Sequence, residues 1–190
     1  KNEWNPEAVS NFWNQLSGTD VLYFSEEVGD MVLEKVDIDR SAGLSIADLG
    51  GGRGMLFPHV RRLFSKARYT LIDVSDASLK SAKENYSNDG QFSDAVDVST
   101  VLSSDFDTQF DLVVSLEVIE HLQDDELEMY GQQLQKLCKP GGKIVISTPN
   151  DEDLEASMVF CPGTNEYFHR MQHVRSWTAE SLSDYLVGLG

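Results

Sequence analysis

Short apolar runs alternate along this chain with segments in which apolar residues recur every three or four positions. The runs predict five strands, at 45–49, 68–74, 91–98, 110–116 and 143–147. The longer spacing predicts helices over 6–16, 24–36, 56–64, 75–86 and 124–138, and from about 178 onward. The fourth run is apolar at almost every position, which is typical of a strand covered by helices on both faces. The pattern predicts an α/β fold built on a mostly parallel sheet.

A glycine-rich turn directly follows the first predicted strand. Its glycines are Gly50, Gly51, Gly52 and Gly54. Residues without a Cβ let a ligand approach the backbone, and the helix that follows offers free N–H groups to it. The order Asp48-x-Gly50-x-Gly52-x-Gly54 differs from the G-x-G-x-x-G spacing that serves a pyrophosphate. An acid at the end of the strand would repel a pyrophosphate and instead suits a cationic ammonium or sulfonium group.

A second acid ends the next predicted strand. Asp73 lies 73 − 48 = 25 residues after Asp48. An acid that binds ribose follows a glycine-rich loop by about 20 residues in dinucleotide-binding folds. Because a carboxylate can accept hydrogen bonds from two neighbouring hydroxyls, Asp73 is a candidate ribose-binding residue.

With these two acids and the glycines, the chain resembles the class I S-adenosylmethionine (SAM) methyltransferases, whose first motif is an acid followed by alternating glycines. Phe110-Asp111 at the start of the fourth strand and the turn 139–142 before the fifth strand are further features of that family. The resemblance covers most of the chain and implies a Rossmann-like fold with SAM as cofactor. The family normally adds a final pair of strands after the last helix; these are absent here, so we expect the sequence to be truncated.

The resemblance also implies where the cofactor lies. Asp48 and the backbone of Gly50–Gly52 would lie at its methionine end, Asp73 would hold the ribose, and Val74 would lie beside the adenine. An acid after the third strand would contact the adenine amino group, and the next backbone N–H would contact the ring. Asp97 with Val98 is our choice, and Asp94 with Ala95 is the alternative, because the pattern leaves the end of this strand open.

The end of the fourth strand carries the candidate catalytic chemistry. Ser115 and Leu116 lie at the edge where ligands bind in open parallel sheets, so we expect them to line the cofactor site. Glu117, Glu120 and His121 follow at once. A helix starting here would place Glu117 and His121 on one face. Glu120 or His121 could then position a substrate or act as a general base, and we take both as the catalytic candidates.

Two other interpretations of this cluster stay open. Glu117, Glu120 and His121 could hold a divalent ion with His173 or His169 as a further ligand, although we do not expect a metal to be required. Small-RNA 3′-end 2′-O-methyltransferases and ubiquinone-biosynthesis O-methyltransferases, two members of the resembled family, have this Glu–Glu–His arrangement. The segment could also be a capped, solvent-exposed turn without a function.

Two other segments are expected to frame the site. We divide the chain into an N-terminal helical lid at 1–40 and a SAM-binding domain at 41–190, within one domain overall. Tyr23 and Phe24 would be the lid residues nearest the ligand, although these aromatic side chains could equally pack on the domain. The pattern dissolves over 150–175, and a loop of this length is typically functional or mobile, so we expect it to close the acceptor pocket.

Composition limits the range of partners. Fifteen basic and 32 acidic residues give a net charge of −17, which disfavours nucleic acid as a substrate. No apolar run approaches the roughly 20 residues of a membrane span, and no signal-peptide pattern opens the chain. The two cysteines, Cys138 and Cys161, lack metal-ligand spacing, so we expect a cytoplasmic protein. Nothing in the sequence indicates its oligomeric state.

The sequence therefore favours a SAM-dependent methyltransferase that acts on an oxygen or nitrogen nucleophile of a small molecule. A metal-dependent RNA 3′-end 2′-O-methyltransferase is the first alternative and requires the Glu–Glu–His cluster to bind an ion. A SAM-binding regulatory domain without catalysis is the second alternative.

Overall fold

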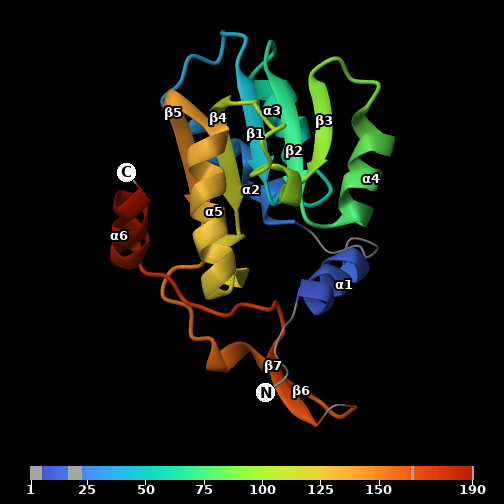
Figure 1. Ribbon diagram of the computed structural model, residues 1–190, viewed down its shortest axis with the longest axis vertical. Helices are drawn as coiled ribbons and strands as arrows, with labels where there is room; N and C mark the ends of the chain where they lie inside the picture. Colours follow the sequence, from blue (N-terminus) through green and yellow to red (C-terminus); the bar gives the residue numbers. More distant parts are fainter. Residues whose placement is uncertain (1–5, 17–22, 164, 190) are drawn as a thin grey trace.

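The computed structural model describes residues 6–16, 23–163 and 165–189. Its α-helices are α1 (Pro6–Leu16), α2 (Phe24–Glu34), α3 (Phe57–Leu63), α4 (Asp76–Tyr86), α5 (Asp124–Leu137) and α6 (Ala179–Leu189). Its strands are β1 (Ser45–Leu49), β2 (Arg68–Asp73), β3 (Phe92–Asp97), β4 (Phe110–Leu116), β5 (Cys138–Ser147), β6 (Met158–Cys161) and β7 (Glu166–His169). The five strands predicted from the apolar runs are β1 to β5. Figure 1 shows their arrangement with the helices.

The first five strands form one parallel sheet with the order β3-β2-β1-β4-β5. Adjacent residues of a strand face opposite sides of this sheet. Ile46 and Leu112 pack with α2, α3 and α4 on one side, whereas Ala47 and Val113 pack with α5 and α6 on the other. Burial on both sides explains why β4 is apolar at almost every position. The predicted α/β fold with a mostly parallel sheet is confirmed.

Two of the sequence features shared with the resembled family lie at the amino edge of the sheet. The Asp111 carboxylate accepts hydrogen bonds from the backbone N–H and the hydroxyl of Ser45, at 2.7 and 2.8 Å. Its other oxygen lies 2.9 Å from Nζ of Lys139. Residues 139–142, predicted as a turn before the fifth strand, lie within β5, where its register with β4 shifts. Ser45, Asp111 and Lys139 therefore join β1, β4 and β5 at the edge opposite the glycine turn, and their role is structural.

The predicted irregular segment at 150–175 contains regular structure. Strands β6 and β7 pair as an antiparallel hairpin that projects below the sheet in Figure 1. The connection contains Pro162 and Gly163, and Asn165 has a φ of 57°. Four-residue strands carry too little periodicity to be recognised alone; their pairing across the turn defines them.

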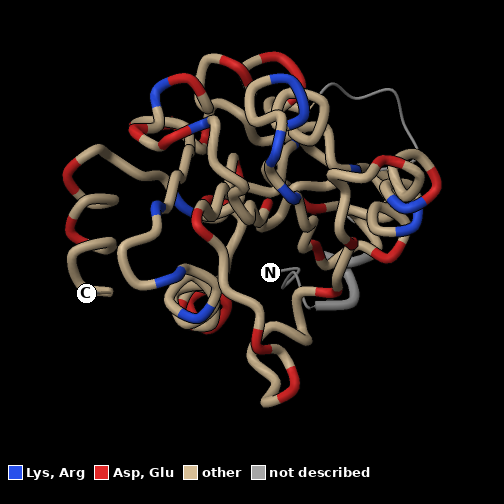
Figure 2. The backbone as a smooth tube through the Cα atoms, turned by 90° about the horizontal axis from the view of Figure 1, so that it is seen from above, with Lys and Arg blue, Asp and Glu red and all other residues tan. Residues whose placement is uncertain are grey.

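Charged groups of both signs cover the molecule. Lys and Arg are interspersed with Asp and Glu when the chain is seen from above (Figure 2). Among the described residues, no helix combines the length and the apolar character needed to cross a membrane.

Candidate active site

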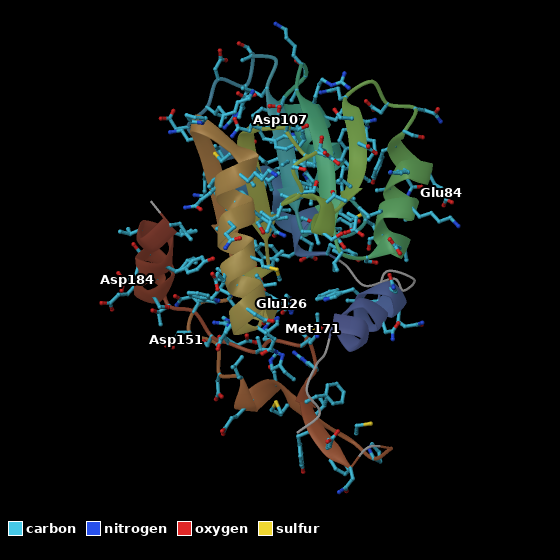
Figure 3. All side chains as sticks on the ribbon, in the orientation of Figure 1. Glu84, Asp107, Glu126, Asp151, Met171 and Asp184 are labelled. Carbon is cyan, nitrogen blue, oxygen red and sulfur yellow. The ribbon has the colours of Figure 1, made fainter. Side chains whose placement is uncertain are left out.

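The site lies at the carboxyl edge of the sheet, which is the lower edge in Figure 3. Glu126 and Asp151 follow β4 and β5 and lie at this edge, whereas Asp107, which precedes β4, lies at the opposite one. All strands of a parallel sheet end at the same edge, so the loops after β1, β2, β3 and β4 meet here.

The glycine turn after β1 has a backbone that other residues adopt with difficulty. Gly50, Gly52 and Gly54 have φ values of 77°, 55° and 76°. A Cβ on Gly50 would lie 2.4 Å from Cγ2 of Val118. The turn after β1 is therefore in direct contact with the segment after β4, which carries the candidate catalytic residues.

Asp73 closes on the glycine turn as its spacing predicts. One carboxylate oxygen accepts a hydrogen bond from the backbone N–H of Gly52, and the other accepts one from Ser75, both at 2.8 Å. The side chain is buried; burial raises the pKa of Asp73, and the two N–H groups oppose that rise. A carboxylate offers about four acceptor positions, so the two that remain fit the vicinal hydroxyls of a ribose.

The structure distinguishes the two candidates for the adenine-binding acid. Asp97 is the last residue of β3 and lies directly beside Asp73 in the sheet register. Asp94 lies within the strand, 3.1 Å from Nζ of Lys83. Asp97 and Val98 are therefore at the ligand edge, as is Val74, which is 45% exposed. Their contacts with adenine stay predictions.

Asp48 lies beneath the glycine turn. Its carboxylate accepts a hydrogen bond of 2.5 Å from the hydroxyl of Tyr69, and a Cβ on Gly51 would lie 2.2 Å from it. The residue is 2% exposed, so in this structure it supports the turn from below. The predicted place of Asp48 at the methionine end of the cofactor stays a prediction. Tyr69, its buried partner on β2, is not singled out by the sequence.

The two residues predicted from the end of β4 are also buried. Ser115 is completely inaccessible, and its hydroxyl donates to the carbonyl of Leu49 at 2.8 Å. Leu116 is 8% exposed. Ser115 therefore joins β4 to β1 beside the glycine turn, and the prediction that either residue contacts the cofactor is untested.

Replacing Asp48 with Asn should change how stability depends on pH. Burial raises the pKa of Asp48 from 3.8 to about 7, against the lowering effect of the Tyr69 hydroxyl. The folded chain then keeps a proton that the unfolded chain releases, so this contribution to stability is lost as the pH rises from about 4 to 7. The free energy of unfolding, measured with denaturant, should fall over this range in the wild type and not in Asp48→Asn. The difference between the two proteins should therefore change by up to about 4 kcal/mol in favour of the variant. Parallel stability curves would contradict this account.

The segment after β4 does not form the helix that the sequence suggested. Glu117 has a φ of 55°, and a single 3₁₀ turn spans Ile119–His121. The Glu117 carboxylate accepts a hydrogen bond of 2.7 Å from the Ser147 hydroxyl on β5. The predicted shared helical face of Glu117 and His121 is therefore wrong, because Glu117 turns the chain toward β5. The interpretation as a solvent-exposed turn is also wrong, since Glu120 is 1% exposed.

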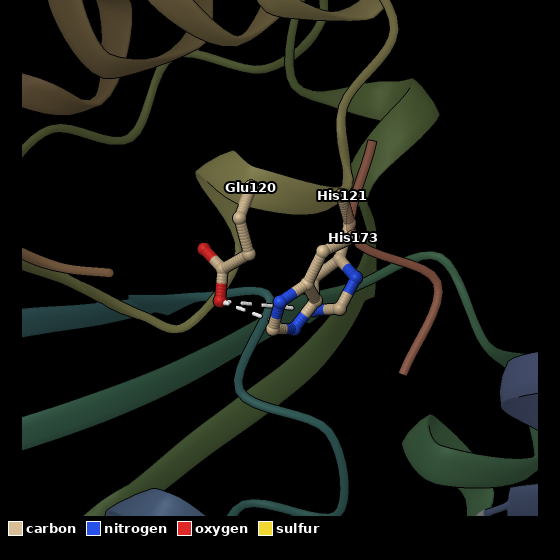
Figure 4. Close-up of side chains that lie close together, drawn as sticks. All are labelled: Glu120, His121 and His173. Atoms are coloured by element: carbon tan, nitrogen blue, oxygen red, sulfur yellow. Dashed lines mark ion pairs between the residues drawn. The ribbon is translucent and has the colours of Figure 1, made fainter. Parts of the chain in front are cut away.

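The segment after the hairpin brings a second histidine to Glu120. Nε2 of His121 lies 3.8 Å from Oε1 of Glu120, and Nε2 of His173 lies 4.0 Å from the same oxygen (Figure 4). The backbone N–H of Val174 donates to the Glu120 carbonyl at 2.9 Å and anchors the segment. One ligand atom from each of Glu120, His121 and His173 lies within 4.8 Å of the others. Glu117 is outside this group.

The hydrogen bonds assign the proton on each of these imidazoles. Nδ1 of His121 faces the carbonyl of Gln172 at 3.3 Å, and Nδ1 of His173 faces a carboxylate oxygen of Glu152 at 2.5 Å. In the neutral tautomer that gives each of these two contacts a donor, Nδ1 carries the proton and Nε2 presents a lone pair. Oε1 of Glu120, which both lone pairs face, is buried without a hydrogen-bond partner. Three acceptors therefore face one another, and a proton or a cation must lie among them.

The ionisation of the cluster agrees with this reading. Burial raises the pKa of Glu120 to about 8 and lowers the pKa of His121 to about 3. Near neutral pH, Glu120 would hold a proton and His121 would be a weak base. A bound divalent ion would stabilise the ionised carboxylate and use both neutral imidazoles, which is the state that metal ligands require.

Helix α1 spans the site. The ring of Trp13 contacts the His121 ring edge to face, with centroids 4.9 Å apart. The neighbouring Asn14 accepts a hydrogen bond of 2.8 Å from the hydroxyl of Ser75, next to Asp73. A Cβ on Gly52 would lie 2.3 Å from the Tyr23 ring, and Phe24 is 41% exposed. Tyr23 therefore lies against the glycine turn, and the prediction that Tyr23 and Phe24 are the lid residues nearest the ligand stays a prediction. Residues 1–5 and 17–22 of the expected lid lie outside the described residues.

Comparisons with known proteins agree with the fold. A family model described as a methyltransferase domain matches residues 24–190. The mitochondrial ubiquinone biosynthesis O-methyltransferase of Dictyostelium discoideum is 29% identical over 161 residues, covering 77% of this chain and 49% of that protein. The chain thus spans about half the length of this curated relative.

Two solved structures show the same fold. A complex of DhpI with SAH has a TM-score of 0.70 at 17% identity and covers 100% of this chain and 89% of that one. The [4+2]-cyclase SpnF also has a TM-score of 0.70 at 17% identity, covering 98% of this chain and 73% of that one. The fold alone therefore does not determine the reaction. Because the family match extends over most of its length, the protein belongs to the class I SAM-dependent methyltransferases.

Proposed function

We propose that this chain transfers the methyl group of SAM to an oxygen or nitrogen nucleophile of a small molecule, and that a hydroxyl is the preferred acceptor. The observation that carries the proposal is the contact between the glycine turn and Val118. The Gly52–Asp73 hydrogen bond belongs to this turn, Glu120 and His121 follow Val118 in the chain, and the segment that carries His173 is bonded to Glu120 through Val174. The name of the curated relative, a ubiquinone biosynthesis O-methyltransferase, supports an oxygen acceptor.

On the donor side, the chain binds SAM and orients its methyl group. SAM, when bound, supplies an electrophilic methyl group on its sulfonium. Asp73 would hold the ribose hydroxyls, and Asp97 with Val98 would hold the adenine. The backbone of Gly50–Gly52 would approach the methionine end, with Asp48 supporting the turn. Tyr23 and α1 would exclude water and align the acceptor with the methyl group.

On the acceptor side, the proton of the hydroxyl must be removed or weakened. Glu120 and His121 were the sequence candidates for this task, but a carboxyl with a pKa of about 8 and an imidazole with a pKa of about 3 are poor bases at neutral pH. Methyl transfer from a sulfonium does not itself require a metal. We nevertheless propose a divalent ion here, because a buried carboxylate oxygen of Glu120, without a hydrogen-bond partner in the described part of the chain, faces an imidazole nitrogen of both His121 and His173.

The donor set indicates which ion suits the site. Glu120, His121 and His173 would supply one carboxylate oxygen and two imidazole nitrogens, a set typical of Zn²⁺ and of other first-row ions such as Mn²⁺. Such an ion would lower the pKa of a bound hydroxyl. Glu117 would be a further ligand only if it released Ser147.

The test is methyl transfer from labelled SAM to a panel of phenols, catechols and amines and to a short RNA, with and without EDTA. We expect label in a hydroxylated small molecule, loss of transfer in EDTA and recovery with added Mn²⁺. Label only in RNA would support the RNA 3′-end alternative, which the net charge of −17 disfavours. Bound SAM with no transfer to any acceptor would support the non-catalytic alternative. Transfer unaffected by EDTA would overturn the proposed ion and leave the methyl transfer intact.

A further inference from the structure

We propose that Glu152, held in place by His169, is a positioning residue that directs Nε2 of His173 toward Glu120 and His121. The inference deepens the proposed function, because it takes Glu120, His121 and His173 as the ligands of a divalent ion. Glu152 and His169 are not themselves ligands in this account.

Glu152 shares its carboxylate between two imidazoles. One oxygen lies 2.5 Å from Nδ1 of His173, and the other lies 3.5 Å from Nε2 of His169. The three side chains are mostly buried: Glu152 is 21% exposed, His173 is 11% exposed and His169 is 4% exposed. Water therefore competes little for these contacts.

The protons of this group can be placed from its hydrogen bonds. The backbone N–H of His173 donates to Nδ1 of His169 at 3.0 Å. His169 thus accepts at Nδ1, and in the neutral ring its proton must be on Nε2, which faces Glu152. The two rings stack, with centroids 4.6 Å apart and planes 22° from parallel. Among the described residues, Nε2 of His169 makes no hydrogen bond and directs its proton toward Glu152 from 3.5 Å, so His169 orients the carboxylate through this close contact.

The position of the proton on His169 decides whether Glu152, His169 and His173 form a metal site or support one. Glu152, His169 and His173 also have ligand atoms within 4.8 Å of one another, so a second metal site is the obvious alternative. Nε2 of His169 carries a proton, however, and a protonated nitrogen has no lone pair to offer an ion. A carboxylate that accepts from the far nitrogen of a metal-binding histidine is instead a recurring arrangement that fixes the tautomer of that ring.

The backbone holds Glu152 in place from the other side. The N–H of Asp151 donates to the carbonyl of Trp177 at 2.7 Å, and Asn150 forms a bridge with Trp177. The segments after β5 and before α6 are therefore tied together next to Glu152. The hairpin contributes through His169, the last residue of β7, so the part of the chain that lacked a helical or strand pattern builds the support of the site.

The experiment is calorimetric titration of Mn²⁺ and Zn²⁺ into the wild type and Glu152→Gln. An amide has one acceptor where the carboxylate has two, so one imidazole N–H loses its partner. We expect 10–100-fold weaker binding of the ion, the range found for such supporting carboxylates. SAM affinity should be unchanged, which also shows that the variant is folded. Asp151→Asn is the control: it removes the same charge one residue away on an exposed side chain, and ion affinity should not change.

Nitrogen-15 spectra of the metal-free protein provide the second readout. His173 should be protonated on Nδ1 in the wild type and should show a mixture of tautomers in Glu152→Gln. Unchanged ion affinity in the variant overturns the inference. If the wild type binds neither ion, the proposed metal site is wrong, and only the spectra test the positioning role of Glu152. In that case, an unchanged His173 tautomer in Glu152→Gln overturns the positioning role as well.

Discussion

Replacing Asp73 with Ala should weaken SAM binding by at least about 100-fold. Without the carboxylate, the two ribose hydroxyls of SAM would lose their hydrogen-bond acceptor, and each such bond is worth about 1.5–3 kcal/mol when one partner is charged. The same change leaves the N–H groups of Gly52 and Ser75 without the acceptor that now orders the glycine turn. Calorimetric titration with SAM measures the loss directly.

Two further variants separate binding from folding. Asp73→Asn keeps the size of the side chain and should also weaken SAM binding, because its amide NH₂ accepts no hydrogen bond and leaves one backbone N–H and one ribose hydroxyl without an acceptor. Asp94→Ala removes an acid from within β3, away from the ligand edge, at a position that contacts Lys83, and should leave SAM affinity within about twofold. Unchanged affinity in folded Asp73→Ala would show that the ribose assignment is wrong.

Replacing His173 with Ala should weaken binding of Mn²⁺ or Zn²⁺ by more than about 100-fold. Loss of a supporting carboxylate alone costs 10–100-fold, and His173 would supply a ligand atom itself. Transfer to a hydroxyl acceptor should fall with metal occupancy, whereas SAM affinity should stay the same. Ion titration and product formation on the same samples make the comparison.

The matched control for this variant is His59→Gln. His59 lies on α3 and pairs with Asp30 at 2.7 Å, on the other side of the sheet from α5. Its loss should not change ion affinity. If His173→Ala keeps its methyl transfer without a metal, the ion is not needed. Glu120 and His121 would then position or deprotonate the acceptor, as the sequence predicted.

The sequence is sufficient to predict the edge of the sheet at which the donor half of the site lies. Parallel strands end at one edge, so Asp48 and Asp73, each at or near the end of a predicted strand, are expected at that edge, whereas the ribose contact of Asp73 stays a prediction. The choice between Asp94 and Asp97 needs the register of β3 on β2, which no local pattern contains. Asp48 is buried against Tyr69 beneath the glycine turn, and Ser115 is buried against Leu49 of β1; their spacing does not reveal this packing.

The acceptor half is less predictable because distant segments build it. Glu117 has an unfavourable positive φ, and its side chain contacts Ser147 on β5. The chain is therefore not helical here, and the helical spacing from Glu117 to His121 is misleading. Glu152 stands in an acidic run that looks like solvated surface. Only the pairing of β6 with β7 brings His169 to it, and the strands of that hairpin are too short for their pattern to be recognised.

The most direct test of the account is an anomalous-difference map from crystals grown with SAH and Mn²⁺. The account predicts SAH on the glycine turn with its ribose at Asp73, and one anomalous peak bounded by Glu120, His121 and His173. A cofactor bound away from Asp73, or an ion found at any other group of residues, would contradict it.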